Sequence, residues 1–100
     1  MEINIQFVKM PTSEHMEAFA IKKIERLGRK FDWIMKADIF YKLEKDPKGK
    51  GKICDIQLSI PGPRIHASSN NEGFELATDK TIDDLEIQLK KRKGEMKSYL

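Results

Sequence analysis

The stretch IHASSNNEGFELATDKTIDDLEIQLKKRKGEMK, residues 65–97, contains the change of pattern that decides the fold. With the arginine before it, its beginning reads RIHAS at 64–68 and predicts a short strand. The serines and asparagines at 68–71 offer N-caps for a helix. The helix that follows carries one stripe of residues at helical spacing: Phe74, Ala77, Thr78, Thr81, Ile82, Leu85 and Leu89. We therefore predict a short strand followed by a long amphipathic helix.

A second amphipathic helix is predicted nearer the N-terminus. Residues 2–9 alternate between apolar and polar side chains like a half-buried strand, and Pro11 ends that pattern. Thr12 and Ser13 then mark a helix start, and the helical pattern continues to about residue 30. Its apolar stripe, one face at about 100° per residue, comprises Met16, Ala20, Ile24, Leu27 and Phe31.

Two more strands and two connections are predicted in the middle of the chain. Residues 37–43 alternate with an aromatic on both faces, which indicates a central strand, and residues 54–60 alternate again. Between them, 45–52 has the composition of a loop with a mobile tip, and PGPR, 61–64, that of a tight turn. The order β-α-β-β-β-α predicts one α+β domain over residues 1–100, a two-layer sandwich of a four-stranded sheet with both helices on one face. The other sheet face is then open to solvent or a partner.

Charge is segregated along the chain, although the net charge is only +3. Residues 21–30, 42–52 and 90–97 together hold 15 of the 19 basic residues but only 4 of the 16 acidic residues. Such segregation gives a nearly neutral molecule a basic face, which is the electrostatic signature of a polyanion-binding protein. In the first helix, five cations share an arc of about 120°: Lys22, Lys23, Arg26, Arg29 and Lys30.

Each basic cluster also has a simpler interpretation. The helix arc could be a solvated face beside an apolar stripe, although exposed helices usually interleave charges of both signs for i,i+4 pairing. The run from Lys90 to Lys93 lies near a helix C-terminus, where the helix dipole favours cations in any protein. In the loop, Lys48, Lys50 and Lys52 could serve solubility or could contact phosphates.

Chemistry other than binding has little support in the sequence. The single cysteine, Cys54, allows no internal disulfide and alternates with apolar residues, so we expect it in the core. His15 and His66 have no acid or cysteine at ligand spacing, and the adjacent Asp83 and Asp84 diverge on a helix. We therefore expect no enzyme activity, no cofactor and no metal. Without a signal peptide or an apolar run of about 20 residues, we expect a cytoplasmic protein and no membrane partner.

The order of elements and both helical segments resemble a known family. The segment quoted above combines an IHAS-type strand with a helix of the form F-E-x-A, I-D-x-L and Q-L-K-x-x-K, and the first helix contributes KKIERLGRKFDWI at 22–34. Over nearly the whole chain they resemble the ribosome hibernation promoting factors, also called ribosome-associated inhibitors or sigma-54 modulation proteins. The resemblance implies a domain shaped like a double-stranded-RNA-binding domain. A chain that stops at Leu100 resembles the short form, for which ribosome dimerisation would need a separate factor.

The resemblance also implies which residues contact RNA. In the first helix the family's contacts fall on Lys23, Arg26 and Arg29, which are all basic here. In the second helix, Asp84 and Ile87 depart from the family's basic stripe. With the neighbouring cations included, the expected RNA-binding residues are Lys22, Lys23, Arg26, Arg29, Lys30, Lys80, Lys90 and Lys91.

Two functions of different classes are compatible with this basic face. The first, implied by the resemblance, is a translation inhibitor that binds the small ribosomal subunit and its rRNA in the channel for messenger and transfer RNA. The second is a regulator that binds an acidic protein through the same face, as the sigma-54 name suggests. Competition by rRNA fragments separates the two.

Overall fold

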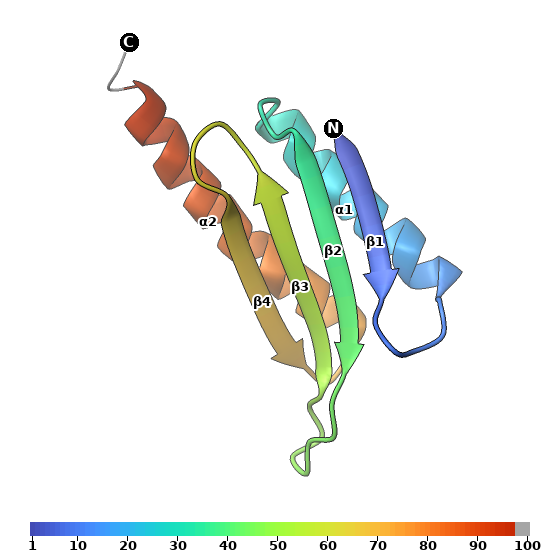
Figure 1. The fold of residues 1–100 in the computed structure, drawn as a ribbon. Coiled ribbons are helices and arrows are strands. Elements are labelled where there is room, and N and C mark those ends of the chain that lie inside the picture. The colour runs from blue at the N-terminus through green and yellow to red at the C-terminus, as the bar shows by residue number, and fades with distance from the viewer. Residues whose placement is uncertain (98–100) are drawn as a thin grey trace.

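The chain folds in the order β-α-β-β-β-α, as the sequence predicts. The structure, a computed structural model, describes residues 1–97. Its elements are β1 (Glu2–Phe7), α1 (Glu14–Lys30), β2 (Lys36–Leu43), β3 (Lys52–Ser59), β4 (Ile65–Asn71) and α2 (Phe74–Lys97), as Figure 1 shows. The side chain of Ser13 caps α1 by accepting a hydrogen bond from the Met16 backbone N–H at 3.2 Å.

The four strands form one mixed sheet in the order β1-β2-β3-β4. The first pair, β1 and β2, is parallel, so α1 is the crossover between them. The other two pairs are antiparallel and are joined by short connections. The central position of β2 confirms the prediction made from the aromatic residues on both of its faces.

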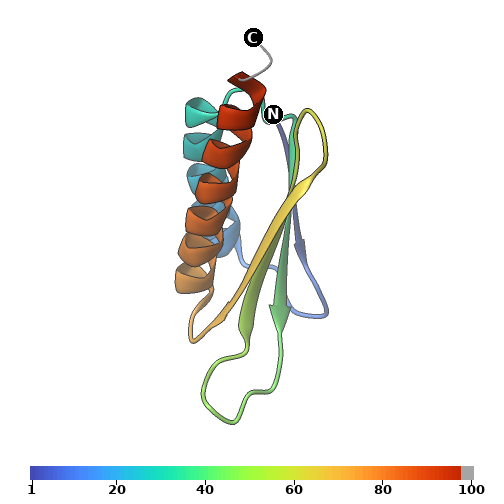
Figure 2. The same cartoon turned by 90° about the vertical axis from the view of Figure 1, so that its left-hand side faces the viewer.

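Both helices cover the same face of the sheet, as the edge-on view in Figure 2 shows. The predicted stripe of α1 is buried along its whole length, and so is most of the α2 stripe, with Phe74 and Ile82 partly buried. The sheet contributes a facing layer of buried side chains: Ala37, Ile39, Tyr41, Cys54, Ile56, Leu58, Ile65 and Ala67. Burial of these apolar surfaces fixes how each helix is rotated, and therefore which side chains point to solvent.

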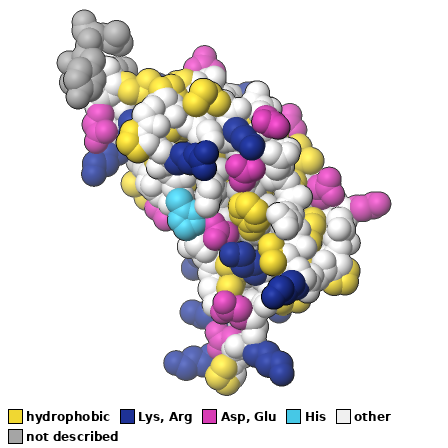
Figure 3. Space-filling view, in the orientation of Figure 1, with side chains coloured by type: hydrophobic (Ala, Val, Ile, Leu, Met, Phe, Trp, Pro, Cys, Tyr) yellow, Lys and Arg dark blue, Asp and Glu magenta, His cyan; other side chains and the backbone are white. Residues whose placement is uncertain are grey.

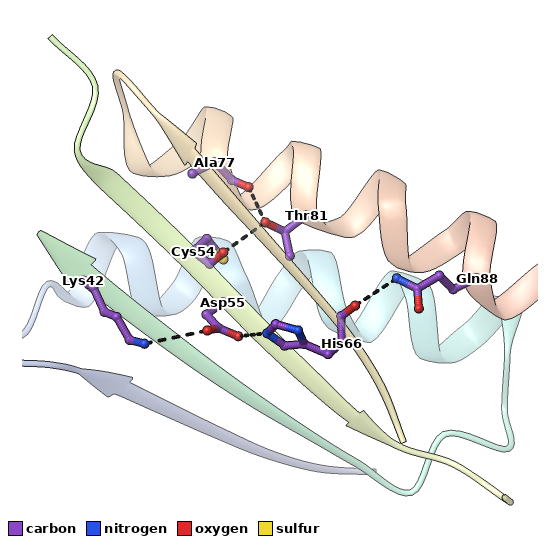
Figure 4. A network of polar contacts seen from close by, with 7 residues as sticks. All are labelled: Lys42, Cys54, Asp55, His66, Ala77, Thr81 and Gln88. Carbon is purple, nitrogen blue, oxygen red and sulfur yellow. Dashed lines mark hydrogen bonds and ion pairs between the residues drawn. The ribbon is translucent and has the colours of Figure 1, made fainter. Parts of the chain in front are cut away.

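Polar groups inside the core are hydrogen-bonded. Thr78 Oγ1 donates to the Phe74 carbonyl and accepts from the Tyr41 hydroxyl, both at 2.7 Å. Thr81 Oγ1 lies 2.7 Å from the Ala77 carbonyl and 3.2 Å from the carbonyl of Cys54 on β3 (Figure 4). Two threonines of α2 therefore attach that helix to β2 and β3, which explains why threonine stands in an otherwise apolar stripe.

Several predicted boundaries are wrong, most clearly around β4. The residues 68–71, predicted to cap the second helix, continue β4 instead, because their backbone pairs with β3 as far as the Lys52–Asn71 register. The α2 helix begins later, and its first turn is closed by the bond from the Ala77 N–H to the Gly73 carbonyl at 3.0 Å. At the other end of the chain, β1 stops at Phe7 because the backbone turns, with Lys9 at a φ of 55°.

Candidate nucleic-acid interface

Five cations of α1 form one outward edge of that helix, which we name the α1 basic edge: Lys22, Lys23, Arg26, Arg29 and Lys30. The buried apolar stripe of α1 holds this edge at the surface, where Lys23 is half-buried and the other four are exposed. The Lys23 ammonium also lies 5.2 Å from the centre of the Phe19 ring, within the range of a cation–π contact. The structure thus brings the five basic residues of α1 together as the sequence predicts.

The α2 helix faces this edge with carboxylates, which we name the α2 acidic edge: Asp79, Asp83 and Glu86. Lys23 pairs with Asp79 at 3.0 Å, and Lys30 pairs with Glu86 at 2.8 Å. From the first pair to the second, both partners advance by seven residues, or two helical turns, so the helices run in the same direction. Between them lies a groove of about 370 Å³, lined by charges of opposite sign on its two sides.

The Glu86 carboxylate is the most strongly engaged of these acids. A hydrogen bond from Lys30, together with the charges of Lys30 and Lys90, lowers the pKa of Glu86 below its ordinary value. Lys90 lies 3.5 Å from the second oxygen of the same carboxylate. Glu86 therefore stays ionised at neutral pH and holds two of the residues predicted to bind RNA.

The remaining cations of the α1 basic edge have no such partner. Within residues 1–97, Lys22, Arg26 and Arg29 form no ion pair. They line, with Phe19 and Lys23, a hollow of about 290 Å³ on the surface of α1. Within the described residues, three of the four cations that line this hollow form no ion pair, and only Lys23 is paired.

The predicted cations of α2 lie apart from this hollow. Lys80 and Lys91 are exposed, together with the departing residues Asp84 and Ile87, on the outer ridge of α2. That ridge is rotated by about 40–100° around the helix from Asp83 in the groove. The α2 acidic edge therefore separates the two sets of cations, and the helices do not form one continuous basic face.

The third basic segment lies elsewhere on the molecule. The other two basic segments, 21–30 and 90–97, lie near each other at one end of the molecule, because Lys30 and Lys90 both contact Glu86. The loop between β2 and β3, within residues 42–52, projects from the opposite end (Figure 1). In Figure 3, Lys and Arg side chains spread from that tip, while the strands above it carry charges of both signs.

Both histidines have carboxylate partners that the sequence analysis missed. His15 lies 3.3 Å from Glu75 on α2, and His66 bonds to Asp55 on the neighbouring strand (Figure 4). Asp55 also lies 3.7 Å from Lys42. These partners are distant in sequence, so spacing could not reveal them; the strand register Gln57–His66 places Asp55 and His66 on one sheet face.

A metal-binding cluster and a membrane-spanning helix are both absent from the part of the chain that the structure describes. Residues 1–97 contain no group of three or more His, Cys, Asp or Glu side chains placed to hold a metal ion. None of the helices within this range has the length and apolar content needed to cross a bilayer. Cys54 is fully buried, as predicted, and this burial raises the pKa of its thiol to about 11.

The chain is similar to known proteins in both sequence and fold. A family model described as Sigma 54 modulation protein / S30EA ribosomal protein matches residues 3–97. The chain belongs to this family. The resemblance stated from the sequence is thereby confirmed over almost the whole length of this chain.

Two curated relatives of this S30EA family member share a name. The chain is 32% identical over 99 residues to the ribosome hibernation promoting factor of Klebsiella oxytoca, a match that covers 99% of this chain and 100% of that protein. It is 30% identical to the factor of the same name from Escherichia coli K12, with the same coverage. The chain thus belongs to the family of ribosome hibernation factors.

Solved structures agree with the S30EA fold. A ribosomal subunit interface protein from Coxiella burnetii superimposes with a TM-score of 0.83 at 26% identity, over 94% of this chain and 99% of that one. The N-terminal domain of Protein Y from Thermus thermophilus gives a TM-score of 0.78 at 24% identity, over 91% and 98% of the two chains. The second likeness supports the fold alone.

Proposed function

We propose that this protein is a ribosome hibernation factor that binds the small ribosomal subunit in the channel for messenger and transfer RNA. The domain inhibits translation by filling that path. The proposal is supported by family membership and by the names of the relatives, which refer to ribosome hibernation and to the ribosomal subunit interface. A ribosomal partner also implies a cytoplasmic location.

The observation that carries the mechanism is the set of uncompensated cations Lys22, Arg26 and Arg29 on α1. Arginine and lysine at this density are suited to phosphate oxygens, and arginine can bind them with two parallel hydrogen bonds. Such contacts fix position but read no base sequence. Specificity for the channel then comes from its shape, in which an elongated, rigid domain fits.

The other predicted RNA-binding residues take secondary roles in this proposal. Lys23 and Lys30 reach phosphate only by exchanging Asp79 or Glu86 for it. Lys90 is likewise held by Glu86, so it is released together with Lys30. A larger share of the affinity therefore comes from the three unpaired cations.

Co-sedimentation with purified small ribosomal subunits tests the proposal. The wild-type protein is expected to co-sediment at low salt and to dissociate as salt rises, because phosphate contacts release counterions. Substituting Lys22, Arg26 and Arg29 by Glu is expected to abolish co-sedimentation. A matched charge reversal of Lys9, Lys36 and Arg64, which lie outside both helices, is expected to weaken it far less.

Three results would contradict this function. Binding that persists unchanged from low to high salt would exclude a phosphate-based contact. Retained binding by the α1 triple variant would remove α1 from the interface. If the α1 basic edge bound an acidic protein instead, rRNA fragments would fail to compete for that binding.

A further inference from the structure

The loop between β2 and β3 concentrates positive charge that the helical interface does not use. Lys45, Lys48 and Lys50 are exposed, and none of them forms an ion pair within residues 1–97. We name residues 45–50 the basic loop. Unlike the α1 basic edge, this loop has no opposing row of carboxylates on a neighbouring helix.

The base of the basic loop is pinned by three residues. The Glu44 N–H donates to the Gly51 carbonyl at 2.8 Å, and the Gly51 N–H donates to the side-chain oxygen of Asn70 on β4 at 2.7 Å. Gly51 adopts a φ of 122°, and a Cβ at this position would lie 2.2 Å from the Glu44 carbonyl oxygen. The close approach of the backbone at Gly51 to the backbone at Glu44 therefore requires glycine at position 51.

The tip is a defined turn in which the loop's acid faces inward. The carboxylate of Asp46 accepts a hydrogen bond from the Lys48 N–H at 2.8 Å, and its carbonyl accepts one from the Gly49 N–H at 3.2 Å. Asp46 is half-buried, and its Cβ lies 3.6 Å from the Cβ position of Gly51. The turn thus keeps the carboxylate against the backbone and leaves the lysines on the outside.

The position of the loop separates it from the α1 basic edge. It extends beyond the sheet and beyond both helices, at one end of a molecule that measures 49 × 25 × 18 Å (Figures 1 and 2). The adjoining ends of α1 and α2 lie at the other end (Figure 1). Figure 3 shows the basic side chains at the tip directed to both sides of it.

We propose that the basic loop is a second phosphate-binding element, which contacts an RNA backbone segment different from the one bound by α1. This inference rests on the proposed ribosomal function and adds a contact at the other end of the domain. Because the loop base is pinned and its tip is a closed turn, binding requires little further ordering of the loop backbone and therefore costs little conformational entropy. Two contacts held apart on one rigid body add their binding strength and fix how the domain lies along its site.

The test replaces Lys48 and Lys50 by Gln and measures binding to purified small ribosomal subunits over a salt series. The logarithmic salt slope is expected to decrease by about two, one for each lost phosphate contact. Affinity at low salt is expected to fall on the order of tenfold. The matched control replaces Lys36 and Arg64 by Gln, which removes the same amount of charge at the opposite end of the sheet. This control is expected to keep the wild-type salt slope.

A second variant tests the pinned base without changing charge. Asn70→Ala removes the acceptor for the Gly51 N–H but leaves every lysine in place. We expect affinity to fall a fewfold while the salt slope stays at the wild-type value. Wild-type affinity in a folded Asn70→Ala protein would overturn the role of the anchor.

The loop proposal and the ribosomal function fail in different ways. If the wild type binds, the α1 triple variant does not, and the Lys48/Lys50 variant behaves like its control, the loop proposal is wrong and the function stands. If the wild type does not bind subunits at all, both are wrong. A loss of affinity with an unchanged slope in the Lys48/Lys50 variant would mean a non-phosphate contact and would also overturn the loop proposal.

Discussion

Removing the charge of Glu86 should weaken the fold and tighten RNA binding at the same time. Glu86 lies 2.8 Å from Lys30 and 3.5 Å from Lys90, with side chains 27%, 55% and 68% exposed. Partly exposed pairs of this kind are worth roughly 0.3–1 kcal/mol each, so Glu86→Gln should lower the free energy of unfolding by about 1 kcal/mol. For a domain of this size, that loss corresponds to a decrease in Tm of about 4–8 °C.

The same substitution frees two lysines for phosphate. In the wild type a phosphate must displace the Glu86 carboxylate from the lysines, which costs roughly 1 kcal/mol. The Glu86→Gln variant does not have this cost, so it should bind about fivefold more tightly. Thermal unfolding and subunit binding at fixed salt measure the two effects. Glu72→Gln, an exposed residue outside both helices, makes the same change in net charge and should alter neither. Unchanged or weaker binding by a folded Glu86→Gln protein would refute the competition between Glu86 and phosphate.

The pH dependence of stability offers an independent check on Glu86. Because the pKa of Glu86 is lowered in the folded protein, its contribution is fully present above the ordinary glutamate pKa of about 4.3. The contribution is lost as pH falls through the lowered folded value. The stability difference between wild type and Glu86→Gln should therefore be constant near neutral pH and vanish in acid, as urea unfolding at several pH values will measure.

Three further predictions concern single positions. Ile87→Arg, at a site 68% exposed, should raise the salt slope of subunit binding by about one and leave stability within about 0.5 kcal/mol; unchanged or weaker binding would mean that α2 does not face RNA there. Gly51→Ala should lower the free energy of unfolding by about 2 kcal/mol or more, because its Cβ meets the Glu44 carbonyl. Gly49 has a φ of 85° but open space around its Cβ position, so Gly49→Ala should lower the free energy of unfolding by only about 1 kcal/mol. Equal costs in urea unfolding would contradict that distinction. Cys54, buried and with a pKa of about 11, should react with a thiol reagent at pH 8 only in denaturant; rapid labelling of the native protein would show that the core opens.

The features that the sequence predicts well are those set by local periodicity. The spacing from Met16 to Phe31 places every buried residue of α1 on one face whatever the strands do. The serines and asparagines at 68–71 are different, because their local preference is for caps and turns. Their extended conformation depends on β3, whose residues 52–55 pair with them across the sheet. A boundary set by such distant pairing cannot be recognised in the strand's own sequence.

The charge balance of the interface was the harder part to predict. The partners Lys23 and Asp79 lie 56 positions apart, and nothing local to either residue connects them. The spacing of the charges nevertheless indicates this pairing. The cations at 23, 26 and 30 follow one another at intervals of about one helical turn, and so do the carboxylates at 79, 83 and 86. Two such complementary stripes on helices that share a sheet face indicate pairing across the groove between them. The clustering of cations along the chain does not show which carboxylates face them, so the sequence alone predicts a more continuous basic face.

Directed hydroxyl-radical probing tests the central claim, that α1 lies against rRNA in the small-subunit channel. Cys54 is buried, so a single cysteine introduced at the exposed Ala18, beside the α1 basic edge, can carry the iron tether. A tether at Ser68 on the open sheet face serves as the comparison. We expect rRNA cleavage from Ala18 at nucleotides lining the channel for messenger and transfer RNA, and weaker cleavage from Ser68. Cleavage from Ala18 only on the outer surface of the subunit, or stronger channel cleavage from Ser68, would contradict the claim.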